Sequence, residues 1–96
     1  MRAFVIAQEN SFDQAMVGEY RQKVVESIAS FGGKFVVRGG ALTVVEGEWP
    51  YERTVVVEFP SRAMAEAWYG SPAYQKVLPL RLNSTRSNLI IVDGVD

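Results

Sequence analysis

The chain has 96 residues, of which 48% are hydrophobic and 22% charged, and 10 basic against 11 acidic side chains leave a net charge of −1. This length predicts a single domain, residues 1–96, with the composition of a globular protein. No run of Lys or Arg suggests a nucleic-acid or anionic-membrane partner, and no apolar stretch approaches the roughly 20 residues of a membrane span.

The sequence contains neither cysteine nor histidine. Thiol catalysis, disulfides and a Ser-His-Asp triad are therefore excluded, as are metal sites built from Cys or His. We expect no cofactor and no metal. The apolar run Arg2–Ala7 is too short and wrongly flanked for a signal peptide, which favours a cytoplasmic location.

A strand and then a long helix are predicted for the first third of the chain. The strand spans Arg2–Gln8. Ser11 and Asp13 both qualify as the N-cap of the helix. Asp13 is favoured, because Phe12 and Val17 can then form a hydrophobic staple. The helix carries one apolar stripe at three- and four-residue spacing, made of Met16, Tyr20, Val24, Ile28 and Phe31.

Glycine pairs divide the next part of the chain. Gly32–Gly33 ends the helix in the left-handed manner, and Lys34–Arg38 reads as a second strand. Gly39–Gly40 then suggests a bulge or hairpin, after which Ala41–Glu46 continues in extended form. A third strand is expected over Glu52–Phe59.

Two short helices and a last strand complete the prediction. Ser61 caps a helix that runs through Tyr69, and Ser71–Pro72 opens the next one, because proline at the first helical position sacrifices no hydrogen bond. Pro79 should break or kink that helix. The last strand spans Asn88–Asp93.

The strands are apolar on both faces, although a half-solvated sheet should alternate apolar with polar residues. The third strand has two alternating sets, which are Val55, Val57, Phe59 and Thr54, Val56, Glu58. The element order βαββαβ predicts a ferredoxin-like α+β sandwich whose helices cover only one face. We expect a second copy to cover the other face, giving a homodimer with its sheets face to face.

Two charged residues are predicted on this dimer-covered face. Glu58 is one of them. If Phe35 and Val37 point towards the helices, Arg38 points outward together with Val36, and it joins Glu58. A buried carboxylate is costly unless it is paired, hydrated or protonated.

Arg38, Arg53 and Arg81 are the candidate partners of Glu58. In a functional interpretation, Glu58 is a general base or acid, and Arg38 or Arg81 holds a substrate carboxylate or an oxyanion. In a structural interpretation, a Glu–Arg pair fixes strand register or dimer orientation. The sequence leaves both open.

Three aromatic residues complete the candidate set. Trp68 lies on the apolar face of its helix and is expected in the core. Tyr74 can bury its ring and present its hydroxyl to a cavity. Trp49 is either a lid or a dimer contact, and we favour the contact.

Several ordered motifs together resemble a known family. They are Gly32–Gly33, Arg38-Gly39-Gly40, Glu46-Gly47-Glu48-Trp49-Pro50, Val56-Val57-Glu58-Phe59-Pro60-Ser61, Ala67-Trp68-Tyr69-Gly70-Ser71-Pro72-Ala73-Tyr74, Arg81 and Val92-Asp93-Gly94. Over nearly its whole length the chain resembles the bacterial domain-of-unknown-function family 1330, within the dimeric α+β barrel superfamily. The resemblance implies a ferredoxin-like protomer and a barrel formed by two sheets, but no reaction.

The residues that match the family's recurrent polar and aromatic positions are Arg38, Glu46, Glu58, Trp68, Tyr74 and Arg81. Among them we expect Glu58 and Arg38 to be catalytic and Tyr74, Arg81, Trp68 and Glu46 to contact a ligand. The expected function is binding of a small molecule in a pocket near the dimer interface, with or without a cofactor-free proton transfer. The alternative is a non-catalytic dimeric structural or interaction module.

Overall fold

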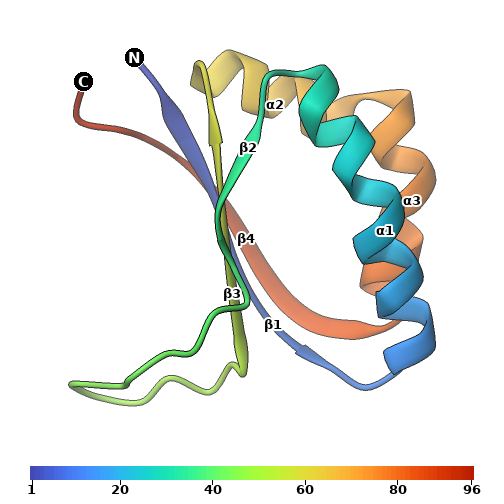
Figure 1. The fold of residues 1–96 in the computed structure, drawn as a ribbon, viewed down its shortest axis with the longest axis vertical. Coiled ribbons are helices and arrows are strands. Elements are labelled where there is room, and N and C mark those ends of the chain that lie inside the picture. The colour runs from blue at the N-terminus through green and yellow to red at the C-terminus, as the bar shows by residue number, and fades with distance from the viewer.

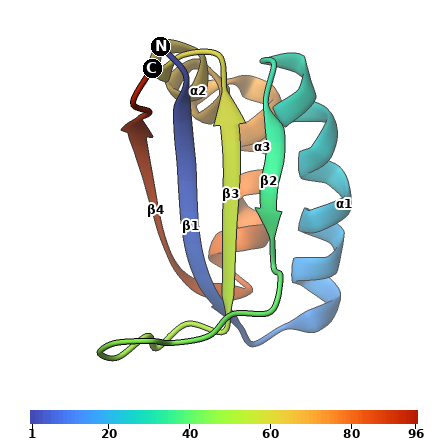
Figure 2. The same ribbon diagram turned by 60° about the vertical axis from the view of Figure 1, so that its left-hand side comes forward.

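Four strands form one antiparallel sheet, and three helices pack on one of its faces (Figure 1). The computed structural model describes residues 1–96. Its elements are β1 (Ala3–Ser11), α1 (Gln14–Ser30), β2 (Lys34–Arg38), β3 (Arg53–Phe59), α2 (Arg62–Gly70), α3 (Pro72–Leu82) and β4 (Thr85–Asp93). The strand order β2-β3-β1-β4 confirms the predicted ferredoxin-like α+β fold (Figure 2).

The predicted N-caps are all confirmed. The Asp13 carboxylate accepts a hydrogen bond from the Met16 amide at 3.0 Å, and Ser61 and Ser71 cap α2 and α3 in the same way. The break expected at Pro79 is wrong, because α3 continues to Leu82. Pro79 lies near the end of α3, where its missing N–H removes one helical hydrogen bond and the remaining turn can still form.

The strands differ from their predicted limits in a way that bears on the site. β1 extends to Ser11 and β4 begins at Thr85, and these two residues pair with each other at the end of the ladder. The expected extended continuation over Ala41–Glu46 is not part of the sheet. Residues 39–52, called the arm below, form no helix or strand and project away from the helices (Figure 1).

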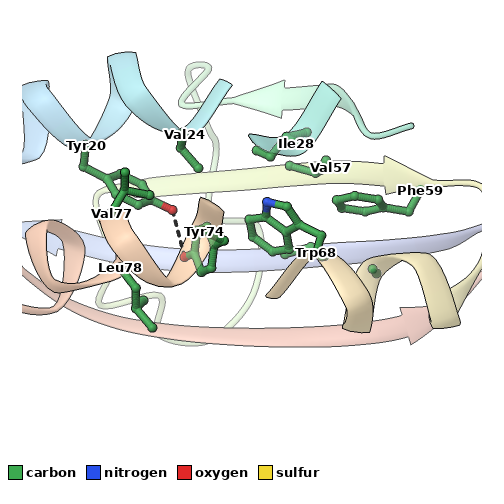
Figure 3. Packing of buried hydrophobic residues seen from close by; sticks show 11 residues of the cluster. Tyr20, Val24, Ile28, Val57, Phe59, Trp68, Tyr74, Val77 and Leu78 are labelled. Atoms are coloured by element: carbon green, nitrogen blue, oxygen red, sulfur yellow. Dashed lines mark hydrogen bonds between the residues drawn. The ribbon is translucent and has the colours of Figure 1, made fainter. Parts of the chain in front are cut away.

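The core lies between the sheet and the helices and is centred on aromatic rings (Figure 3). Trp68 is 2% exposed, which confirms its core position, and its ring centroid lies 4.1 Å from that of Tyr74 and 5.5 Å from that of Phe59. Burying a large apolar side chain contributes about 1.5–3 kcal/mol, so this cluster holds α2 and α3 on the sheet.

A β-bulge changes which way β2 presents its last residues. Phe35 pairs with Val57, but the next paired residue is Val37, opposite Val56, so Val36 is the extra residue. A one-residue insertion reverses the facing of everything after it. The expectation that Val37 points inward and Arg38 outward is therefore wrong: Val37 lies on the outer face, and Arg38 lies on the helix side.

The outer face and the arm carry exposed apolar side chains. On β4, Ile90 is 55% and Val92 is 42% exposed, although both belong to a regular strand. On the arm, Val45 is 85% and Trp49 is 45% exposed. No helix has the length and apolar character needed to cross a membrane.

Candidate functional site

A small, partly open pocket of about 40 Å³ lies between the inner face of the sheet and α1. Most of its wall is apolar and comes from the sheet, α1 and α2. The apolar wall consists of Val5, Ala7, Tyr20, Val24, Ile28, Phe35, Val55, Val57, Trp68 and Leu89. The polar wall consists of Glu9, Arg21, Arg38, Arg53 and Arg81.

Glu9 is the single acidic residue of this wall. It continues the inward-facing series of β1 after Ala3, Val5 and Ala7, and it is only 5% exposed. Its Oε1 lies 3.7 Å from Nε of Arg53, its partner on β3. That distance is too long for a hydrogen bond, so the attraction is one of charge alone.

The second carboxylate oxygen of Glu9 is also incompletely paired. Its Oε2 lies 3.7 Å from an Nη of Arg21 on α1, and it accepts no hydrogen bond. The Nε–H groups of Arg21, Arg53 and Arg81 likewise have no acceptor. Buried polar groups nearly always have a partner, so four unsatisfied atoms on one wall are unusual.

Arg53 lies close to two other positively charged side chains, Arg21 and Arg38. Burial lowers the pKa of its guanidinium, and repulsion from Arg21 and Arg38 acts in the same direction, whereas Glu9 opposes it. The guanidinium packs against the backbone of Gly39, whose φ is +70°. A Cβ at Gly39 would overlap the Arg53 side chain, so this glycine is required both for the turn and for the room it leaves.

Arg38 lies at the edge of the pocket after the bulge. One Nη donates a hydrogen bond to the Arg21 carbonyl at 2.9 Å, and the guanidinium carbon lies 4.3 Å from the Phe35 ring centroid. The remaining donors of the guanidinium have no protein partner. A ring face beneath a guanidinium restricts its position while leaving its edge free to bind.

Arg81 reaches the pocket from α3 and is 5% exposed. One Nη donates to Ser87 Oγ at 2.8 Å. Close by, the hydroxyl oxygens of Tyr20 and Tyr74 lie 2.9 Å apart and share a hydrogen bond (Figure 3). Burial raises the pKa of both phenols, so both are neutral at physiological pH.

The structure brings together only part of the predicted site. Arg38, Arg81 and Trp68 line the pocket, and the ring of Tyr74 is buried as expected. Tyr74 does not line the pocket, and its hydroxyl instead contacts that of the pocket-lining Tyr20; its predicted contact with a ligand stays a prediction.

Glu58 lies on the outer face as predicted. The prediction that Arg38, Arg53 or Arg81 pairs with it is wrong. Its Oε1 is 3.2 Å from an Nη of Arg2, which sequence reasoning did not consider. Since Glu58 and Arg38 occupy opposite faces, one site of the protomer cannot hold both. Their catalytic roles stay predictions that have to be tested separately.

Glu46 lies on the arm, away from the pocket. It borders a surface hollow of about 490 Å³ between the arm and the outer face of the sheet, together with Val37 and Trp49. Its ligand-binding role also stays a prediction. No group of three or more acidic side chains in the structure has the arrangement of a metal site.

Sequence reasoning missed Glu9 and Arg21. The signal for Glu9 was present, because extending the β1 alternation by two residues places a carboxylate on the inward face. Arg21 had no such signal: it lies beside the apolar stripe of α1, where a long basic side chain is usually solvated.

The comparisons with known proteins agree with this fold. The model of the family described as "Domain of unknown function (DUF1330)" matches residues 2–95. The chain belongs to the DUF1330 family. No curated protein matches it.

Solved structures similar to this DUF1330 chain share its fold at low sequence identity. A protein of unknown function from Rhodopseudomonas palustris is 16% identical, with a TM-score of 0.80 over 99% of this chain and 83% of that one. A dimeric ferredoxin-like protein of unknown function from Jannaschia sp. CCS1 is 12% identical, with a TM-score of 0.79 over 98% and 100%. SnoaB, a cofactor-independent oxygenase from Streptomyces nogalater, is 7% identical, with a TM-score of 0.64 over 99% and 94%.

Proposed function

We propose that this DUF1330 protein binds a small organic molecule in the pocket between the sheet and α1. The observation that carries the proposal is a partly open, mostly apolar pocket with one polar wall on which a carboxylate oxygen and three guanidinium N–H groups lack partners. Small-molecule sites combine an apolar body with a few convergent polar groups in this way. Arg38, Arg81 and Trp68 belong to the proposed site.

A homodimer is the second part of the proposal. The outer face exposes Ile90 and Val92, and the arm adds Val45 and Trp49, so covering them removes apolar surface from water. The similar Jannaschia structure is described as dimeric, which supports the same assembly here. Glu58 and Glu46 lie on this side, and we assign them to the dimer contact rather than to the pocket.

A fragment screen by thermal unfolding tests the binding proposal. A ligand present at 100 times its Kd stabilises the folded state by about 2.7 kcal/mol, which is a readily measured shift in Tm. Ala7→Leu fills the pocket from its floor and should abolish the shift. Ala67→Leu, on the exposed side of α2, is the matched control and should retain it.

Two results would contradict the proposal. In one, no fragment stabilises the protein. In the other, Ala7→Leu folds normally and still shows the full ligand-dependent shift, which would place the ligand elsewhere.

A further inference from the structure

The charges on the pocket wall do not balance. Four guanidinium groups, from Arg21, Arg38, Arg53 and Arg81, face one carboxylate, from Glu9. Arg81 and Glu9 are each 5% exposed, so water screens this part of the wall poorly. No other acidic side chain lines the pocket. An unpaired cation in such a place is costly, and a bound anion would remove much of that cost.

The free hydrogen-bonding atoms also fit an anion. The Nε–H groups of Arg21, Arg53 and Arg81 have no acceptor, and Glu9 satisfies none of them. Its closest approaches to Arg21 and Arg53 are 3.7 Å, whereas charge-assisted N–H···O bonds are about 2.7–2.9 Å long. The wall therefore contains more buried donors than acceptors, and its positive charge is not neutralised from within the protein.

We propose that the ligand of this pocket is a compact monocarboxylate with an apolar body, whose carboxylate group binds at the arginine wall. The inference rests on the proposed function and names its ligand class. Guanidinium groups bind carboxylates through paired N–H donors, and the exposed guanidinium of Arg38 uses only one Nη in a protein hydrogen bond. The apolar body fits against Val24, Phe35 and Trp68, and the small volume of the pocket restricts its size.

Phosphate is the other anion that arginines bind, and it fits less well. Phosphate carries more charge and more oxygens than a carboxylate, and each oxygen needs a donor once it is buried. The wall offers its donors from one side only, and the rest of the pocket is apolar. A carboxylate presents two oxygens to that wall and an apolar remainder to the other side.

Glu9 has a defined role in this proposal. Its carboxylate is the protein's own partial counter-ion and lies among the groups that receive the ligand. It therefore repels the incoming carboxylate. Glu9→Gln should tighten carboxylate binding several-fold, whereas loss of a purely structural residue would weaken binding or leave it unchanged.

The experiment compares acids with their neutral amides. Acetate, butanoate and benzoate are titrated by calorimetry at fixed ionic strength, beside acetamide, butanamide, benzamide and inorganic phosphate. At least one acid should bind, and it should bind roughly 10-fold or more tightly than its amide, because the carboxylate forms a charge-assisted pair with a guanidinium and the neutral amide does not. Phosphate should bind more weakly than that acid.

Arg38→Gln should weaken the acid roughly 10-fold or more, and Arg38→Lys should be intermediate, because it keeps the charge but loses the fork. Arg38 is exposed and outside the core, so both variants should fold. Arg86→Gln, at an exposed arginine away from the pocket, is the control and should leave binding unchanged.

The outcomes separate the two proposals. Equal binding of an acid and its amide would overturn the carboxylate inference while leaving a small-molecule pocket. Stronger binding of phosphate would overturn it in favour of a different anion. Failure of all three acids, or weaker acid binding by Glu9→Gln, would also overturn it. Failure of the fragment screen together with the acids would remove the proposed function as well.

Discussion

The hydrogen bond between Tyr20 and Tyr74 is the clearest place to test the energetics of this core. Both rings are buried, and the two hydroxyl oxygens lie 2.9 Å apart, so that one hydroxyl donates a hydrogen bond to the other (Figure 3). Tyr20→Phe or Tyr74→Phe alone removes the bond and leaves the other hydroxyl without this partner in a desolvated place. Each single substitution should therefore lower the free energy of unfolding by about 1–3 kcal/mol.

The double substitution should cost much less than the sum of the two. With both hydroxyls replaced by hydrogen, neither tyrosine leaves the other's hydroxyl unpaired, and the ring packing is kept. We expect the double variant to be about as stable as either single variant, which corresponds to a coupling of about 1 kcal/mol or more.

Urea unfolding followed by far-ultraviolet circular dichroism measures these differences. All variants are compared at one protein concentration, because self-association makes stability concentration-dependent. Tyr51→Phe is the control: its hydroxyl accepts a bond from Asn88 at an exposed position, and its loss should cost little. Additivity of the two core substitutions to within about 0.5 kcal/mol would show that the two hydroxyls are not coupled.

Three further predictions follow from the same structure. The free energy of unfolding should fall as the pH rises above about 10. Burial raises the pKa of both core tyrosines, so the unfolded chain loses these protons at a lower pH than the folded chain does. A denaturation series from pH 8 to 11 that shows no decline would contradict this prediction. Ile90→Glu should convert the proposed dimer to monomer in sedimentation, because it places a charge on the exposed apolar surface of the outer face. A dimer that persists in this variant would exclude the outer face as the interface. Gly39→Ala should destabilise the fold by about 1 kcal/mol or more, because φ is +70° at Gly39 and the new methyl group meets the Arg53 guanidinium. Gly40→Ala, whose methyl group meets no other atom, should be near neutral in urea unfolding. Equal effects of the two substitutions would contradict this prediction.

Much of the fold could be predicted because its signals are local. Asp13, Ser61 and Ser71 each combine a capping side chain with a following helical pattern, and all three caps are confirmed. The alternation of β3 also correctly separated an inward set from an outward set that contains Glu58. These signals depend only on residues close together in the chain, so no knowledge of tertiary contacts was needed.

The orientation of Arg38 could not be predicted, because the bulge before it has no local signature. Val36 and Val37 are both valines, so either one satisfies the inward or the outward face equally well. Alternation alone cannot show which residue is the extra one. The bulge becomes visible only when β2 is paired with β3, which places Val37 opposite Val56.

The two faces of β3 explain why charge occurs on both sides of an apolar sheet. On the outer face, Glu58 meets Arg2 at 3.2 Å, so its charge is already compensated within the protomer. On the inner face, Arg53 meets only a shared carboxylate at 3.7 Å, and further arginines surround it. An interface between two copies tolerates charges that are already paired. A ligand of opposite sign can pair with charges that are left unpaired beside a cavity. In the function proposed above, the sheet therefore separates assembly from binding, and the bulge in β2 places Arg38 on the side of the proposed pocket.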